Sequence, residues 1–109
     1  MKTIRNNTGN WTKRDSFNAK ACMSLKDVAG KTLTVKKCAI GTDIDENNEE
    51  IETATLVCEE GTFGTISATA IDMCDDLIDM IDDDGALKIR VNMRKANNGR
   101  DYIVLELVD

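Results

Sequence analysis

The densest set of chemically active side chains in this sequence is a row of aspartates between residues 69 and 85. The stretch TAIDMCDDLIDMIDDDG holds seven aspartates and no basic residue. Paired carboxylates are what a two-metal nuclease site requires. Ile71, Leu77 and Ile81, however, recur at the spacing of one helix face, and the aspartates fill the other angles of that helix. Because such carboxylates face open water, we expect a solvated helix face and not a metal or catalytic site.

The same stretch carries signals for both ends of the helix. Thr69, with Asp72 three residues on, predicts the N-cap, and Gly85 predicts an end in a left-handed conformation. Like charges four residues apart cost roughly 0.2–0.5 kcal/mol per pair. Each large apolar residue buried on the inner face contributes roughly 1.5–3 kcal/mol. Packing therefore outweighs repulsion, and we expect an amphipathic helix that is stable only in the folded protein.

Two other patterns could bind a metal ion, and neither is complete. Asp43, Asp45 and Asn47 occupy the first, third and fifth positions of a calcium loop. Asn48 and Ala54 then stand where that loop needs a glycine and a bidentate glutamate. The four cysteines are widely spaced and no histidine is present, which argues against a zinc site and a histidine-activated nucleophile. We expect buried, reduced cysteines, no metal, no cofactor and no enzymatic activity.

Length and composition indicate one globular domain. The chain has 109 residues, of which 41% are hydrophobic and 31% charged, enough for a single core. No apolar run reaches membrane-spanning length, and the first residues lack the apolar centre of a signal peptide. We therefore expect a cytoplasmic protein without a membrane partner.

The net charge of −6 conceals a separation of the two signs along the chain. Residues 1–37 carry nine basic and two acidic side chains, and residues 38–87 carry fifteen acidic and no basic ones. Residues 88–109 carry five basic and three acidic ones. Binding to phosphate depends on the local face that is presented and not on the total charge. An acidic protein of this kind can therefore bind nucleic acid through its two basic segments.

Periodicity and turn signals predict five strands. A parity switch between Val35 and Cys38 predicts a bulge in the first strand, and residues 41–50 are expected to form a polar loop. Gly61 and the Asn98–Gly99 pair predict the turns of two hairpins. The predicted strands span residues 31–40, 51–58, 62–67, 86–94 and 101–108.

Three strands, a helix and a two-stranded hairpin follow one another in the order of the OB-fold. We therefore predict a mainly β domain over residues 24–109, a five-stranded OB-type Greek-key barrel with one amphipathic helix between strands three and four. A generic α+β sheet covered by one helix gives the same local signals and stays open as an alternative. Residues 1–23 are predicted to form a basic N-terminal arm that adds a strand, swaps onto a second copy to give a homo-oligomer, or orders only on DNA.

In such barrels, the face around strands two and three binds single strands by stacking and phosphate contact. Phe63 is expected to line this face together with Thr53, Thr55 and Thr65. Core filling stays open as an alternative for Phe63 and Trp11, and a solvated surface stays open for the basic residues. The residues predicted to bind nucleic acid are Trp11, Lys36, Lys37, Phe63, Arg90, Arg94, Lys95, Arg100 and Tyr102.

Three segments and the acidic helix resemble a known family. The segments are SLKDVAGKTLTV (24–35), CEEGTFGTIS (58–67) and IRVNMRKANNGRDYIVLEL (89–107). They are similar to small single-stranded-DNA-binding proteins of bacteriophages that infect low-GC bacteria. The resemblance implies an OB-type barrel without enzymatic activity that coats single-stranded DNA during phage replication or recombination in the host cytoplasm. It also implies that Thr62–Ser67 and Arg94–Arg100 face DNA, whereas the acidic loop 41–50 departs from what a DNA-bordering loop would carry.

The function predicted from the sequence is therefore sequence-independent binding of single-stranded DNA. Replication or recombination proteins are further expected partners, through the acidic helix. The alternative is an acidic protein-interaction module, or an inhibitor that imitates DNA and docks on a basic host protein. Reversing Asp72, Asp76 and Asp79, compared with reversing Arg94 and Arg100, separates the two.

Overall fold

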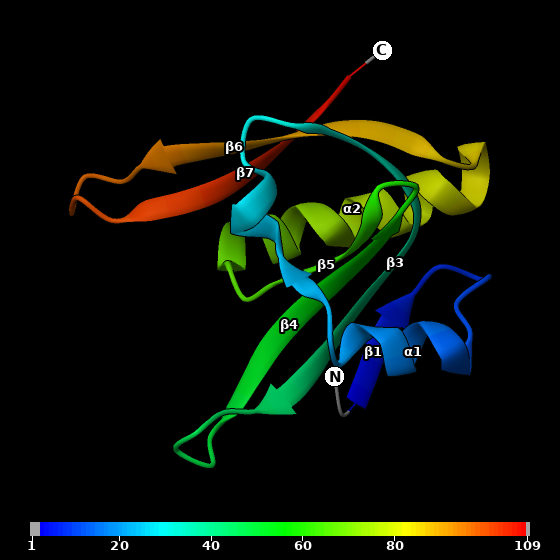
Figure 1. Ribbon diagram of the computed structural model, residues 1–109, viewed down its shortest axis with the longest axis horizontal. Coiled ribbons are helices and arrows are strands. Elements are labelled where there is room, and N and C mark those ends of the chain that lie inside the picture. The colour runs from blue at the N-terminus through cyan, green and yellow to red at the C-terminus, as the bar shows by residue number, and fades with distance from the viewer. Residues whose placement is uncertain (1–2, 109) are drawn as a thin grey trace.

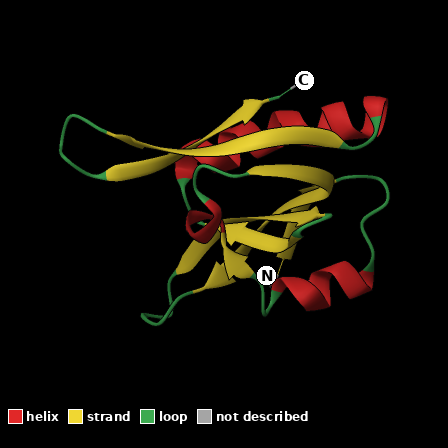
Figure 2. Ribbon diagram, turned by 45° about the horizontal axis from the view of Figure 1, so that its top comes forward, coloured by secondary structure: helices red, strands yellow, loops and turns green. Residues whose placement is uncertain are grey.

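A computed structural model describes residues 3–108 as one mainly β fold with two α-helices (Figure 1). The strands form a curled, open sheet. In Figure 2, α2 runs beside the long β6–β7 hairpin, and α1 lies on the other side of the remaining strands. The elements in chain order are β1 (Thr3–Asn7), α1 (Lys13–Ala19), β2 (Met23–Ser24), the 3-10 helix η1 (Leu25–Val28), β3 (Thr32–Ile44), β4 (Glu50–Cys58), β5 (Gly61–Thr65), α2 (Ala68–Asp84), β6 (Leu87–Lys95) and β7 (Asp101–Leu107).

The sheet is organised around the long strand β3. The order of the strands is β2-β5-β4-β3-β6-β7, and β1 also pairs with β3. The first part of β3 pairs with β6, and residues 39–42 pair with β1 along the same edge. The register shifts between Val35 and Lys37, which confirms the predicted bulge and bends the strand. Because of this bend, β3 joins the part of the sheet formed with β6 and β7 to the part formed with β1, β4 and β5.

All five predicted strands are present, as β3 to β7, and two more strands come from the N-terminal segment. The prediction of five strands is therefore too low. β1 pairs with residues 39–42, so β3 continues to Ile44 where a polar loop was expected. Only residues 45–49 remain between β3 and β4. The extra partner on the outer edge of β3 explains why this polar segment is a strand.

The acidic helix α2 has the predicted inner face. Ile71, Cys74 and Leu77 are buried along it, together with Ile78 and Ile81. The helix packs mainly on β3, β7 and β4, so its stability comes from the sheet. The predicted N-cap, Thr69, was wrong, because the N-cap is Ser67, two residues earlier, and it makes no side-chain cap bond. Gly85 ends the helix as predicted, with a positive φ of 81°, but its ψ of −154° is not that of the left-handed conformation that was expected.

The core lies between α2 and the inner face of the sheet. Phe63 is 3% exposed and belongs to this core, together with Leu56 and Ile103. Cys38, Cys58 and Cys74 are buried as expected, whereas Cys22 is partly exposed. Burial is the largest of the causes that raise the pKa of the Cys58 thiol to about 12. Within residues 3–108, no helix is both long and apolar enough to cross a membrane.

The N-terminal segment is held to the rest of the protein by polar contacts at both of its ends. The Asn6 side-chain amide donates to Asp75 and the Gly9 backbone N–H donates to Asp82, so β1 and the turn after it lie along α2. Further on, Asp15 of α1 pairs with Lys37 of β3 at 2.9 Å. The segment was predicted to add a strand, to swap onto a second copy, or to order only on DNA. The structure agrees with the first of these, because β1 pairs with β3.

Candidate nucleic-acid interface

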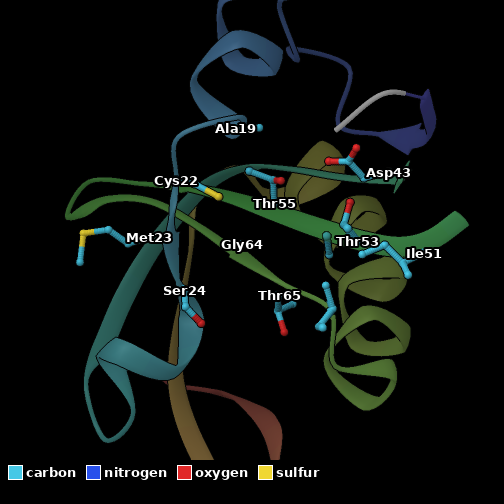
Figure 3. Close-up of a pocket in the computed structure, with 12 residues that line it drawn as sticks. Ala19, Cys22, Met23, Ser24, Asp43, Ile51, Thr53, Thr55, Gly64 and Thr65 are labelled. Carbon is cyan, nitrogen blue, oxygen red and sulfur yellow. The ribbon is translucent and has the colours of Figure 1, made fainter. Parts of the chain in front are cut away.

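A groove runs along β5 on the side of the sheet opposite to α2. Its first part lies between β2, β4 and β5 and is walled by Thr53, Thr55, Thr65 and Ile66 (Figure 3). The register explains Thr53 and Thr55, because Gly64 lies opposite Thr55 and both therefore share the outer face. Thr65 lies opposite Ala54, on the side of Phe63, and lines the groove as the last residue of β5. The three threonines were predicted to line this face, and they do so.

The groove continues past the end of β5 to the β6–β7 hairpin. Its middle part is walled by Thr65, Ile66 and Tyr102, with Lys26 at its side. Its last part lies between the hairpin and the start of α2 and is walled by Lys95, Arg100 and Tyr102. Successive parts share lining residues, so they form one surface, which we call the β5 groove.

The hairpin end of the β5 groove is suited to an anion. Lys95 and Arg100 are exposed, and neither has an ion-pair partner among the described residues. The first turn of α2 also faces this part of the groove through Ala68 and Thr69, and it contains no acidic residue. Unpaired backbone N–H groups at a helix start carry partial positive charge. Asp101 is the one acidic residue on this wall, so two cations and a helix start outweigh it.

The middle and first parts of the groove offer apolar contact surface. Ile66 is 69% exposed. Met23, at the edge of the first part, is 56% exposed, but its side chain points away from Thr55 and Thr65 (Figure 3). Tyr102 is half-buried and lines both the middle part of the groove and its cationic end. Flat apolar surfaces next to hydroxyl groups suit the faces and edges of nucleobases.

Two of the predicted aromatic residues lie outside the groove. Phe63 points into the core, because the two-residue turn that pairs Cys58 with Gly61 also places Phe63 opposite Leu56. Its predicted role in stacking was therefore wrong for this structure. Trp11 lies between β1 and α1, where its indole N–H donates to the Ser16 hydroxyl at 2.8 Å, and it does not line the β5 groove.

The remaining predicted cations divide into two groups. Arg90 and Arg94 lie on the outer face of β6 and line no part of the groove. Arg94 stands opposite Tyr102 in the hairpin and is paired with Glu106 at 3.1 Å. Lys37 is paired with Asp15, and Lys36 lines a separate hollow that contains Asp82 of the acidic helix. The structure thus brings Lys95, Arg100 and Tyr102 together at the groove and places Lys36 and Lys37 elsewhere.

Sequence reasoning missed Lys26 and Ile66. Ile66 could have been found, because the alternation that buries Phe63 places Gly64 and Ile66 on the outer face. No sequence signal indicates that β2 pairs in parallel with β5, which is what brings Cys22 and Ser24 to the groove (Figure 3).

Cys22 closes one side of the first part of the groove. Its Sγ would lie 2.7 Å from a Cβ placed on Gly64, so only glycine allows β2 to approach β5 this closely. Burial raises the pKa of the Cys22 thiol, which is therefore protonated at neutral pH. The cysteine acts as a close-packed wall of the groove (Figure 3).

A scan against protein-family models, a search of curated proteins and a search of solved structures each found no match to this chain. The resemblance to phage single-stranded-DNA-binding proteins therefore stays a prediction.

Proposed function

We propose that this protein binds single-stranded DNA without sequence preference and acts in phage DNA replication or recombination. The observation that supports it is the β5 groove, which joins exposed apolar residues and threonine hydroxyls to a cationic end at Lys95 and Arg100. We also propose that β3 to β7 correspond to an OB-type barrel, since α2 stands between the third and fourth of these strands.

In this proposal, the two halves of the groove contact different parts of a nucleotide chain. Lys95 and Arg100 contact phosphates, and the start of α2 adds N–H groups beside them. Bases lie against Tyr102 and Ile66. Contacts of this kind read no base edge in a fixed pattern, so binding is independent of sequence.

Fluorescence anisotropy of a labelled oligo(dT), titrated with protein at several salt concentrations, tests the proposal. We expect log K to fall linearly with log salt, with a slope near −0.7 for each phosphate contacted. Replacing both cations (Lys95→Glu with Arg100→Glu) should weaken binding and make the slope shallower by about 1.4, the equivalent of two phosphates. The label must be on the DNA, because Trp11 does not line the groove.

Lys36→Glu is the matched control for each single reversal, Lys95→Glu or Arg100→Glu, because it makes the same change of charge in the hollow that contains Asp82. This variant should bind like the wild type. Equal losses in Lys36→Glu and in the groove variants, or no binding of the wild type at low salt, would refute the proposal.

A further inference from the structure

A second groove, on the other side of the protein, lies between α2 and the last strand of the sheet. It is walled by Met73, Leu77 and Met80 of α2 and by Leu105 and Leu107 of β7. Leu107 is 59% exposed, and both methionines are only partly buried. We call this surface the α2–β7 groove. It shares no lining residue with the β5 groove.

The strand that forms one wall of this groove has a free edge. β7 is the end of the sheet, and among residues 3–108 it pairs only with β6. On the other side of β7, the Leu105 backbone N–H donates to the Met73 sulfur at 3.3 Å. A thioether is a weak acceptor, so a stronger one can replace it without a large cost. The edge therefore offers both apolar contacts and a backbone donor.

The rim of the groove is acidic. Asp76 lies in its wall, and Asp72 and Asp79 stand one turn to either side of Asp76 on the same helix. α2 contains no basic residue. Glu106 completes the rim on β7, where it is paired with Arg94. An occupant that covers the apolar floor must therefore place positive charge beside the aspartates.

We propose that the α2–β7 groove docks a short segment of another protein in which apolar residues alternate with lysine or arginine. The apolar side chains would contact Met73, Met80 and Leu107, and the cations would face Asp72, Asp76 and Asp79. Methionine side chains adapt to different apolar partners. A second copy of this chain would bring an equally acidic rim against the first, and nucleic acid would be repelled. This inference does not depend on the function proposed for the β5 groove.

Methyl NMR spectra of the methionines in the full-length protein test the inference, because the two grooves carry different reporters. Met73 and Met80 report on the α2–β7 groove, and Met23 reports on the β5 groove. The probe is the peptide Lys-Leu-Arg-Leu-Lys-Leu. Its controls are the acidic peptide Glu-Leu-Asp-Leu-Glu-Leu and the polar peptide Lys-Ser-Arg-Ser-Lys-Ser. We expect the probe to shift the Met73 and Met80 signals in a saturable way and to leave Met23 unchanged, and both controls to have no effect.

Two charge reversals on the same helix provide the matched variants. Asp76→Lys should weaken binding of the probe peptide roughly fivefold, because Asp76 lines the groove. Asp84→Lys makes the same change at an exposed position that does not line it and should leave the affinity unchanged. Leu107→Ser should also weaken binding, since it removes an exposed apolar contact.

Several results would overturn the inference. They are the absence of any shift at Met73 and Met80, an equal response to the polar peptide, and an equal loss of affinity in the two reversals. Sedimentation provides a further test. A dimer that forms with rising concentration and is abolished by Leu107→Ser would identify the occupant as a second copy of this chain and reject a basic partner.

Discussion

Asp15 is the side chain that fixes the N-terminal segment to the sheet. It accepts hydrogen bonds from the Thr12 backbone and hydroxyl as part of a capping box, and from the Lys37 ammonium at 2.9 Å. Burial raises the pKa of this carboxyl, but the hydrogen bonds from Lys37 and Thr12 outweigh burial and hold it below the ordinary value. One carboxylate therefore both starts α1 and ties it to β3.

Replacing Asp15 should destabilise the protein in a pH-dependent way. Asp15→Asn removes the charge and should lower the free energy of unfolding at pH 7 by about 1–3 kcal/mol. Because the folded-state pKa of Asp15 is depressed, its contribution is complete above the ordinary pKa and is lost as the pH falls through the folded-state value. Urea denaturation should therefore show the two proteins converging below about pH 4. Asp27→Asn, at an exposed position in η1, is the control and should change little.

The close approach of Cys22 to Gly64 predicts an energetic coupling between them. Gly64→Ala would place a Cβ 2.7 Å from the Cys22 sulfur and should push β2 away from β5. Cys22→Ala removes the obstacle. A double-mutant cycle measured by urea denaturation should thus give a favourable coupling of about 0.5–3 kcal/mol. Simple additivity of the two substitutions would show that β2 does not lie against Gly64.

Phe63 shows what sequence reasoning could and could not supply for single residues. The segments β4 and β5 were placed correctly, but Phe63 was grouped with Thr53 and Thr55 on the outer face. A two-residue turn between Cys58 and Gly61 fixes the register and puts Phe63 opposite Leu56. That register was within reach of the sequence. Lys95, Arg100 and Tyr102 were predicted correctly as neighbours because they share one hairpin, whose geometry is local.

Elements with a clear period were predictable, whereas those defined by distant contacts were not. The inner face of α2 and the alternation of β6 are visible in the sequence, and both are present. β1 reads TIRNN, which has no alternation, and β2 has two residues. These strands exist because β3 and β5 offer them free edges. The N-terminal half of the fold therefore depends on tertiary pairing that no local pattern records.

Two similar substitutions on α2 should change the free energy of unfolding differently, because the two aspartates have different surroundings. Asp79 is exposed and stands four residues from both Asp75 and Asp83. Asp79→Asn relieves both repulsions and should raise the free energy of unfolding by about 0.4–1 kcal/mol. Asp82 instead accepts the Gly9 N–H at 2.8 Å, so Asp82→Asn should give no gain. Urea denaturation of both variants in low salt measures the difference, and equal effects would contradict the assigned contacts.

At the scale of the whole molecule, the acidic face of α2 and the cationic end of the β5 groove are separate surfaces. The aspartates of α2 begin at Asp72, beyond the first turn of the helix, whereas Lys95 and Arg100 lie where the β6–β7 hairpin meets the helix start. The groove itself also contains two acidic residues, Asp43 and Asp101. This arrangement lets a protein with a net charge of −6 present a cationic surface. How strongly the aspartates of α2 weaken binding of DNA in the β5 groove depends on the Debye length.

Salt should therefore decide whether the acidic helix affects binding of nucleic acid. The molecule extends 37 Å along its longest axis, and the Debye length is about 30 Å at 0.01 M salt but about 8 Å at 0.15 M. A variant with Asp72→Asn, Asp79→Asn and Asp83→Asn should bind oligo(dT) several-fold more tightly than the wild type at the lower salt, because long-range repulsion is reduced. At the higher salt the two proteins should bind equally, since the β5 groove is unchanged. Anisotropy titrations at both salt concentrations measure this. Weaker binding by the variant at both would mean that the helix face itself contacts the ligand, and the assignment of the acidic helix face and the binding groove to separate surfaces would be wrong.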